Sequence, residues 1–219
     1  MKNKFIITLG SALMIATLIM SVINTISISK LSKHHSPVYD GYTYAIDCVR
    51  EAEIEYHRCY AEYVTEVQNY ITSVAPNSNL RGYAVVEQCE KYGVDVKFVL
   101  VQGEIESHYG TKGIGAKLNN VFNVGVFDGL THSEINKQYR YDYPNESIEP
   151  YLKLLTTRYL VNKLEADLMD NYVDINGKRY ASDELYETKF KAKYKYITDN
   201  TKIDELQDKV RSYAIKCGR

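Results

Sequence analysis

The sequence predicts a mainly helical α+β domain with one or two small β-hairpins, preceded by an N-terminal apolar helix. The 219-residue chain is 45% hydrophobic and 25% charged, a composition typical of globular proteins. Several segments place apolar residues at helical spacing, which indicates amphipathic helices. Two short sequences, Asp128-Gly129 and Asn176-Gly177, are typical of hairpin turns.

The N-terminal segment, residues 5–29, is an uncharged stretch of 25 residues. A helix of about 20 residues crosses the apolar core of a bilayer, so this stretch is long enough to do so. Lys2 and Lys4 before it and Ser27-Ile28-Ser29 at its end also fit a cleaved signal peptide. We therefore expect residues 1–30 to be a signal anchor or signal peptide. The anchor would hold the protein at a membrane through residues 5–29.

The charge balance bears on which partners the chain can bind. It has 27 basic and 28 acidic residues and a formal net charge of −1, which argues against a nucleic-acid-binding protein. The first 30 residues contain three lysines and no acid, so the remaining 189 carry a net charge of −4. The part of the chain after the apolar segment is therefore mildly acidic.

The four cysteines are Cys48, Cys59, Cys89 and Cys217. They contain no C-x-x-C pair, so neither a zinc site nor a thioredoxin-like redox motif is indicated. No cofactor is expected. An even number of cysteines permits disulfides outside the cytosol, but buried free thiols fit the pattern equally well. Cys48 and Cys59 would lie about 16 Å apart along one helix, which is too far for a bridge between them.

The first long helix is predicted over residues 46–72, after a polar connector. Val49, Tyr56, Tyr63 and Tyr70 recur every seven residues and form a narrow apolar seam on this helix. Because only about three heptads are present, we expect the helix to dock on the domain rather than to form a coiled-coil stalk.

Two further helices are predicted around a glycine turn. The first covers about residues 80–92 and ends at Gly93, because glycine favours the position just after a helix. The second begins near Val96, with Asp95 as its N-cap.

One carboxylate on the second of these helices is unusual. Glu106 lies on the same face as Val99 and Gly103, so it continues an apolar stripe. A buried Glu at the C-terminal end of a helix is poorly hydrated and faces backbone carbonyls, which raises its pKa, as a general acid requires. Glu104 lies about 200° around the helix from Glu106 and is not expected to share its cleft.

The remaining elements are predicted from turn signals and periodicity alone. In chain order they are a flexible glycine-rich loop over 110–115, a hairpin strand over 122–127, a helix over 145–169 and a final helix over 202–216.

Four groups of residues, in the same order, resemble motifs of the glucosaminidase family of peptidoglycan hydrolases, glycoside hydrolase family 73. They are residues 90–94 with 101–110, residues 119–124, residues 141–148 and residues 180–186. The resemblance implies a lysozyme-like fold. The chain would then comprise the apolar segment 1–30, a connector and amphipathic helix over 31–77, a glucosaminidase-like catalytic domain over 78–200 and a C-terminal helix over 201–219.

The catalytic residues follow from the same resemblance. Glu106 matches the family's catalytic Glu. The family's second acidic residue lies on a β-hairpin, where this chain offers only Asp128 and Glu134, neither of them in a matching motif. Asn123 replaces the glycine of a family motif, and asparagine is able to adopt the left-handed backbone conformation that glycine favours.

Four residues are expected to bind substrate because they fall in the matched motifs: Tyr109, Asn120, Phe122 and Tyr141. Sugar rings stack on aromatic faces while their hydroxyl groups need polar partners, and tyrosine offers both. The chain has 21 Tyr and no Trp, so tyrosine would have to provide all Trp-like stacking. No metal is expected at the site.

The resemblance implies an endo-β-N-acetylglucosaminidase that cleaves the β-1,4 glycan backbone of peptidoglycan. Its partners would be glycan strands and a membrane, and its catalytic domain would lie outside the cytoplasm, membrane-anchored or secreted. A lytic transglycosylase or muramidase of the same fold is an alternative, as is a non-catalytic wall-binding or phage virion module. A bacterial enzyme of wall remodelling and a phage lysin fit the sequence equally.

Overall fold

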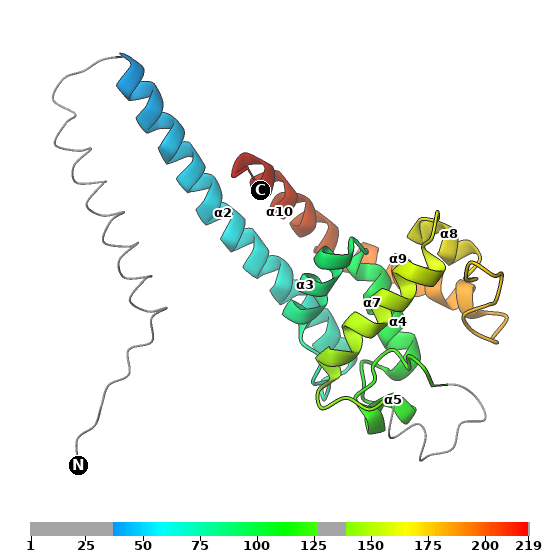
Figure 1. Ribbon diagram of the computed structural model, residues 1–219. Coiled ribbons are helices and arrows are strands. Elements are labelled where there is room, and N and C mark those ends of the chain that lie inside the picture. The colour runs from blue at the N-terminus through cyan, green and yellow to red at the C-terminus, as the bar shows by residue number, and fades with distance from the viewer. Residues whose placement is uncertain (1–36, 127–138, 219) are drawn as a thin grey trace, which may run out of the picture. The chain divides into compact units, whose positions relative to one another are not determined.

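The computed structural model describes residues 37–126 and 139–218 (Figure 1). The chain divides into two compact units, residues 1–52 and residues 53–219. The predicted apolar segment 5–29 lies outside the described residues. Among the residues that are described, no helix is both long and apolar enough to cross a membrane.

The first described helix, α2, covers Pro37–Val74. It begins earlier than the predicted residue 46, so part of the expected connector is helical. From residue 53 onward its apolar seam contributes Cys59, Tyr63 and Tyr70 to the core of the second unit. The prediction that this helix docks on the domain is therefore confirmed for that part of α2. Val49, the first residue of the predicted seam, belongs to the first unit and is 47% exposed.

The centre of the second unit is α4, Val96–Ser107. It packs against α3 (Gly82–Tyr92), α5 (Gly113–Leu118) and α9 (Tyr186–Asn200). Figure 1 shows α4 among these helices. The first eight residues of α4 are all buried, so this helix is enclosed on every side rather than amphipathic.

The turn between α3 and α4 forms as the sequence predicts. Gly93 has a φ of 67°, and its N–H donates to the carbonyl of Glu90 at 3.3 Å. The Asp95 side chain accepts a hydrogen bond from the backbone N–H of Lys97 at 2.8 Å. Both caps are confirmed, and together they fix the position at which α4 starts.

The helix predicted over residues 145–169 is wrong as one continuous element. A 3₁₀ turn, η1 (Pro144–Ser147), leads into α7 (Ile148–Leu154), a π-helical turn, η2 (Leu155–Tyr159), and α8 (Glu165–Asp170). The hydroxyl groups of Thr156 and Thr157 donate to the carbonyls of Leu152 and Lys153 at 2.8 and 2.6 Å. Such bonds often bend helices. The helix is interrupted between η2 and α8, where Asn162 has a φ of 57°.

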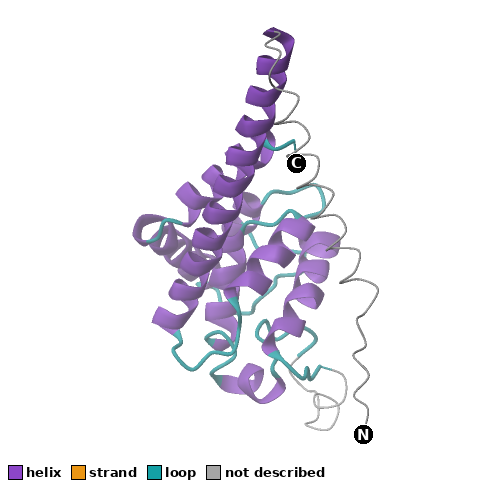
Figure 2. Cartoon of the chain, turned by 90° about the vertical axis from the view of Figure 1, so that its left-hand side faces the viewer, coloured by secondary structure: helices purple, strands orange, loops and turns teal. Residues whose placement is uncertain are grey.

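The described residues contain helices and loops but no extended strand (Figure 2). Residues 122–126 form turns, so the described part of the first predicted hairpin strand is wrong. The second predicted hairpin is reduced to a single bridge between Val173 and Arg179, around Gly177 with a φ of 78°. The end of the expected glycine-rich loop, from Gly113, is helical and begins the short helix α5.

Two helices complete the unit. The final helix, α10 (Ile203–Lys216), agrees with the predicted residues 202–216 and buries Leu206 and Val210. Helix α9 was not predicted, because only Tyr186, Phe190 and Ile197 of its 15 residues are buried and its polar residues conceal that spacing.

We predict that Gly82→Ala destabilises the protein by about 1–3 kcal/mol, because overpacking at a rigid contact costs that much. A Cβ atom at Gly82 would lie 2.7 Å from the backbone nitrogen of Gln68 on α2. Tyr83→Ala, at the neighbouring exposed position, is the control and should change stability by less than about 0.5 kcal/mol. Urea unfolding measures both variants, and equal midpoints would contradict this account of the α2–α3 contact.

Candidate active site

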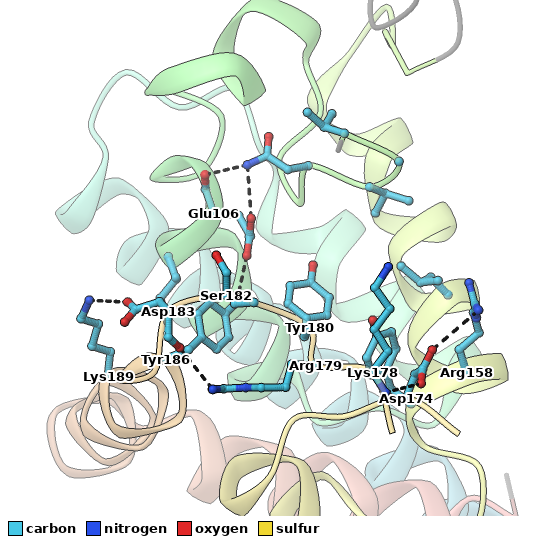
Figure 3. Close-up of a pocket in the computed structure, with 18 of the residues that line it drawn as sticks. Glu106, Arg158, Asp174, Lys178, Arg179, Tyr180, Ser182, Asp183, Tyr186 and Lys189 are labelled. Carbon is cyan, nitrogen blue, oxygen red and sulfur yellow. Dashed lines mark hydrogen bonds and ion pairs between the residues drawn. The ribbon is translucent and has the colours of Figure 1, made fainter. Parts of the chain in front are cut away.

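A pocket of about 1310 Å³ lies at the C-terminal end of α4 in the second unit. Its walls come from the end of α4, residues 123–126, Tyr139, the η2 turn, the loop from 174 to 183 and the start of α9. Figure 3 shows the labelled side chains that line it. Segments far apart in sequence thus meet around one cavity.

Glu106 is largely buried in the wall of this pocket and is held by three uncharged side chains. Gln102 Nε2 and the Tyr186 hydroxyl donate to Glu106 Oε1 at 3.0 and 2.9 Å. Asn123 Nδ2 donates to Glu106 Oε2 at 3.2 Å and to its backbone carbonyl at 2.9 Å. In the described part of the chain Glu106 forms no ion pair, unlike most acidic groups around the pocket.

The environment of Glu106 alters its protonation. Burial raises the pKa of the Glu106 carboxyl above its ordinary value of 4.5, and the hydrogen bonds from Tyr186, Asn123 and Gln102 offset part of that rise. Burial and the nearby Glu106 charge also raise the pKa of the Tyr186 hydroxyl, which therefore stays a donor. The site thus favours a neutral carboxyl more than water does.

Left-handed backbone geometry shapes the loop that carries one of these donors, Asn123. Asn123 has a φ of 49°, so asparagine does adopt the conformation expected at this position. His108 and Tyr109, directly after α4, also have positive φ values of 53° and 55°. Strained residues of this kind persist where the surrounding structure over-determines them, often near functional sites.

Glu104 also borders the pocket, so the prediction that Glu104 and Glu106 do not share a cleft is wrong. The pocket extends around the end of α4 and reaches both faces of the helix. Glu104 is engaged differently from Glu106, because it accepts from the Tyr70 hydroxyl at 2.9 Å and pairs with Lys193. Its charge is therefore compensated.

Two other described carboxylates line the pocket, and each has a cationic partner. Asp183 pairs with Lys189 at 2.6 Å, and Asp174 lies 3.6 Å from Arg158. The bond from Lys189 lowers the pKa of Asp183, and backbone hydrogen bonds, chiefly from Lys178, lower that of Asp174. Both are suited to remain ionised.

Tyr109 and Phe122 require a correction. Both side chains are buried in the core, at 0% and 1% exposure, and neither lines the pocket. The Tyr109 ring packs against Gly103, and Phe122 stacks on Tyr151 with ring centroids 4.4 Å apart. Both rings are covered by other side chains of the core, so neither exposes a face on which a sugar could stack.

Asn120 and Tyr141 also lie away from the pocket surface. Asn120 is fully buried, and its amide group bonds the backbone of Val124 in both directions, at 3.0 and 3.1 Å. Tyr141 is half-buried and joins Leu118 through its backbone N–H. These residues hold the shape of the loop rather than line the pocket.

Sequence reasoning missed the aromatic residues that do line the pocket: Tyr139, Tyr159, Tyr180 and Tyr186. The available signal was the motif at residues 180–186, whose first and last residues, Tyr180 and Tyr186, both line the pocket. Tyr180 stacks on Tyr172 at 4.6 Å, which fixes the orientation of its ring.

The candidate second acids, Asp128 and Glu134, lie outside the described residues. Val126 and Tyr139, the residues on either side of that stretch, both line the pocket. Within residues 37–126 and 139–218, no group of three His, Cys, Asp or Glu side chains is placed to hold a metal ion. Cys59 and Cys89 are buried free thiols, and Cys217 is also free.

A largely buried, protonatable carboxyl beside an open pocket lined by tyrosines is the arrangement expected of a carbohydrate-cleaving hydrolase. The sequence matches the Glucosaminidase family, described as mannosyl-glycoprotein endo-beta-N-acetylglucosaminidase, over residues 82–199. The chain belongs to this family, and the matched residues run from the start of α3 to the penultimate residue of α9. No curated protein matches the chain. Family membership supports a glycoside hydrolase that acts on peptidoglycan.

We predict that Glu106→Gln stabilises the protein at neutral pH. A buried carboxyl whose folded pKa is raised costs stability as pH rises from its unfolded pKa through its folded pKa, whereas Gln does not titrate. The gain over wild type should therefore be small near about pH 4 and larger near about pH 8. A gain of 1 kcal/mol corresponds to about 2–4 °C in Tm.

Thermal unfolding across this pH range measures the effect. Glu184→Gln, at an exposed position, is the control and should follow wild type at every pH. If the difference in Tm between Glu106→Gln and wild type does not grow with pH, the assignment of Glu106 as a buried acid is contradicted.

Proposed function

We propose that the protein is an endo-β-N-acetylglucosaminidase that cleaves the β-1,4 glycan backbone of peptidoglycan, with Glu106 as general acid. The observation that carries this proposal is the burial of Glu106 beside the pocket, with neutral hydrogen-bond donors and no cationic partner among the described residues. A carboxyl in such a setting stays protonated nearer neutral pH and can protonate the glycosidic oxygen of a departing sugar.

The tyrosines of the pocket support a sugar substrate. Tyr139, Tyr159 and Tyr180 line the cavity and are each only partly buried. Tyr159 and Tyr180 contact each other edge-to-face, with centroids 5.4 Å apart, so their rings have set orientations. Such rings offer flat apolar faces to sugar rings and hydroxyl groups to sugar hydroxyls.

The positive charge that develops on the sugar needs a negative partner. In this proposal it is stabilised by a second carboxylate, Asp128 or Glu134, or by the acetamido group of the substrate itself. The described pocket acids, Glu104, Asp174 and Asp183, already have cationic partners and are weaker candidates.

The proposal extends to where the enzyme works. Peptidoglycan lies outside the cytoplasmic membrane, and the uncharged residues 5–29 are long enough for an anchor or export signal. We therefore place the catalytic domain outside the cytoplasm. Wall remodelling by a bacterium and wall lysis by a phage enzyme are both compatible with this placement.

We expect Glu106→Gln in the full chain to release soluble muropeptides from purified peptidoglycan about 10²–10⁴-fold more slowly than wild type, because a general acid contributes that much. Glu184→Gln should retain wild-type activity. Equal release by wild type and Glu106→Gln would contradict the assignment of the general acid.

Mass spectrometry of the released products separates the related functions. Reducing N-acetylglucosamine ends support the proposal. Reducing N-acetylmuramic acid ends would indicate a muramidase, and anhydromuramyl ends a lytic transglycosylase. Sedimentation with the wall but no hydrolysis would indicate a binding module instead.

Tyr186→Phe should shift the descending limb of the pH–kcat profile to higher pH. The Tyr186 hydroxyl lowers the pKa of Glu106 by donating to it, so its removal keeps the acid protonated to higher pH. Tyr196→Phe, on the exposed surface of α9, is the matched control and should not move the limb. A shift to lower pH in Tyr186→Phe would contradict this role.

A further inference from the structure

The cationic side chains of the pocket differ in how closely they pair with acidic residues. Five lysine and arginine residues line it in the described part of the chain: Arg158, Lys178, Arg179, Lys189 and Lys193. The last three are tightly held, because Arg179 lies 2.7 Å from Glu187, Lys189 lies 2.6 Å from Asp183, and Lys193 pairs with Glu104.

The other two cations retain free hydrogen-bonding capacity. Among the described residues, the Arg158 guanidinium has one ion pair, with Asp174 at 3.6 Å, and its side chain is 53% exposed. Lys178 is exposed and has no ion pair among the described residues. Figure 3 shows both residues beside Asp174, with the Lys178 side chain directed away from that carboxylate.

Asp174 offsets only one of these two positive charges. Its Oδ1 atom accepts two backbone hydrogen bonds, from Asn176 at 2.8 Å and from Lys178 at 2.9 Å, which build the turn of the hairpin. Its side chain is only 4% exposed, so the carboxylate is largely withdrawn from solvent. One end of the pocket therefore has two cations beside one carboxylate, and one oxygen of that carboxylate already accepts the backbone hydrogen bonds of the turn.

The backbone joins the two segments that carry these cations. Arg158 belongs to the π-helical turn η2, and π-turns within helices frequently occur at functional sites. The carbonyl of Arg158 accepts a hydrogen bond from the N–H of Ile175 at 2.9 Å, which ties this turn to the hairpin that carries Lys178. The two side chains thus come from segments that are joined directly to each other.

We propose that Arg158 and Lys178 form a subsite for the carboxylates of the peptide stems that peptidoglycan carries on its muramic acid residues. This inference rests on the proposed function, because it assigns the substrate class of the same pocket. Arginine and lysine are the side chains suited to bind carboxylates by charge-assisted hydrogen bonds. Uncharged β-1,4 glycans such as chitin carry no carboxylate and therefore cannot form a charge-assisted pair with this subsite.

Neither cation contacts Glu106 in the described structure, so in this proposal the subsite contributes to binding more than to chemistry. Loss of such an interaction raises KM with little change in kcat. Because both side chains are exposed, we expect an effect of about fivefold, the upper end for a solvent-exposed ion pair.

The test uses the full chain and soluble glycan strands whose amino groups have been acetylated. One half of the strands keeps its stem carboxylates, and the other half has them converted to neutral methylamides with a carbodiimide. We expect wild type to cleave the amidated strands with a kcat/KM about fivefold lower, mainly through KM. The double variant Arg158→Gln/Lys178→Gln should cleave both kinds of strand at the same reduced rate.

Two further variants serve as controls. Lys195→Gln, on the exposed surface of α9 and outside the pocket, should retain the wild-type preference. Lys178→Arg keeps the positive charge and should therefore retain most of the preference for strands that carry stem carboxylates. Equal cleavage of both strands by wild type, or an undiminished preference in the double variant, would overturn the subsite while leaving the glycosidase intact. No cleavage of either strand by wild type would overturn the proposed function itself.

Discussion

The rest of the site depends on the burial of one carboxyl group at the end of a helix that is enclosed on all sides. Glu106 sits in the last turn of α4, where Gln102, Asn123 and Tyr186 donate to it and no described cation pairs with it. An ion pair would hold the carboxylate charged, whereas neutral donors leave burial as the dominant influence on its pKa. Glu106 thus differs from the other described acids of the pocket, because its hydrogen-bond partners are neutral whereas theirs include a cation.

The loop after α4 positions one of those donors, Asn123. The Ser107 hydroxyl donates to the carbonyl of Val121 at 2.6 Å and accepts from the N–H of Gly110, which joins the end of α4 to the loop. Asn120 then bonds the backbone of Val124, and the chain between them turns so that Asn123 faces Glu106. The residues that resemble a substrate-binding motif therefore act mainly as the frame that orients the acid.

Local signals in the sequence predicted local structure well. The glycine stop at Gly93, the cap at Asp95 and the left-handed Asn123 depend on a few neighbouring residues, and all three form as expected. Tyr109 was misassigned because a motif position does not reveal whether its side chain faces the pocket or the core. The role of Tyr186 depends on α9 packing against α4, a contact over about 80 residues that periodicity cannot predict.

The central claim is that Glu106 remains a protonated acid nearer to neutral pH than an ordinary glutamate. Carbon-13 NMR of the side-chain carboxyls in glutamate-labelled full chain, recorded across a pH titration, measures this directly. The account predicts one resonance that titrates above the ordinary value of 4.5 and is absent from Glu106→Gln. If the resonance lost in Glu106→Gln titrates at or below 4.5, burial does not control this carboxyl and the account is contradicted.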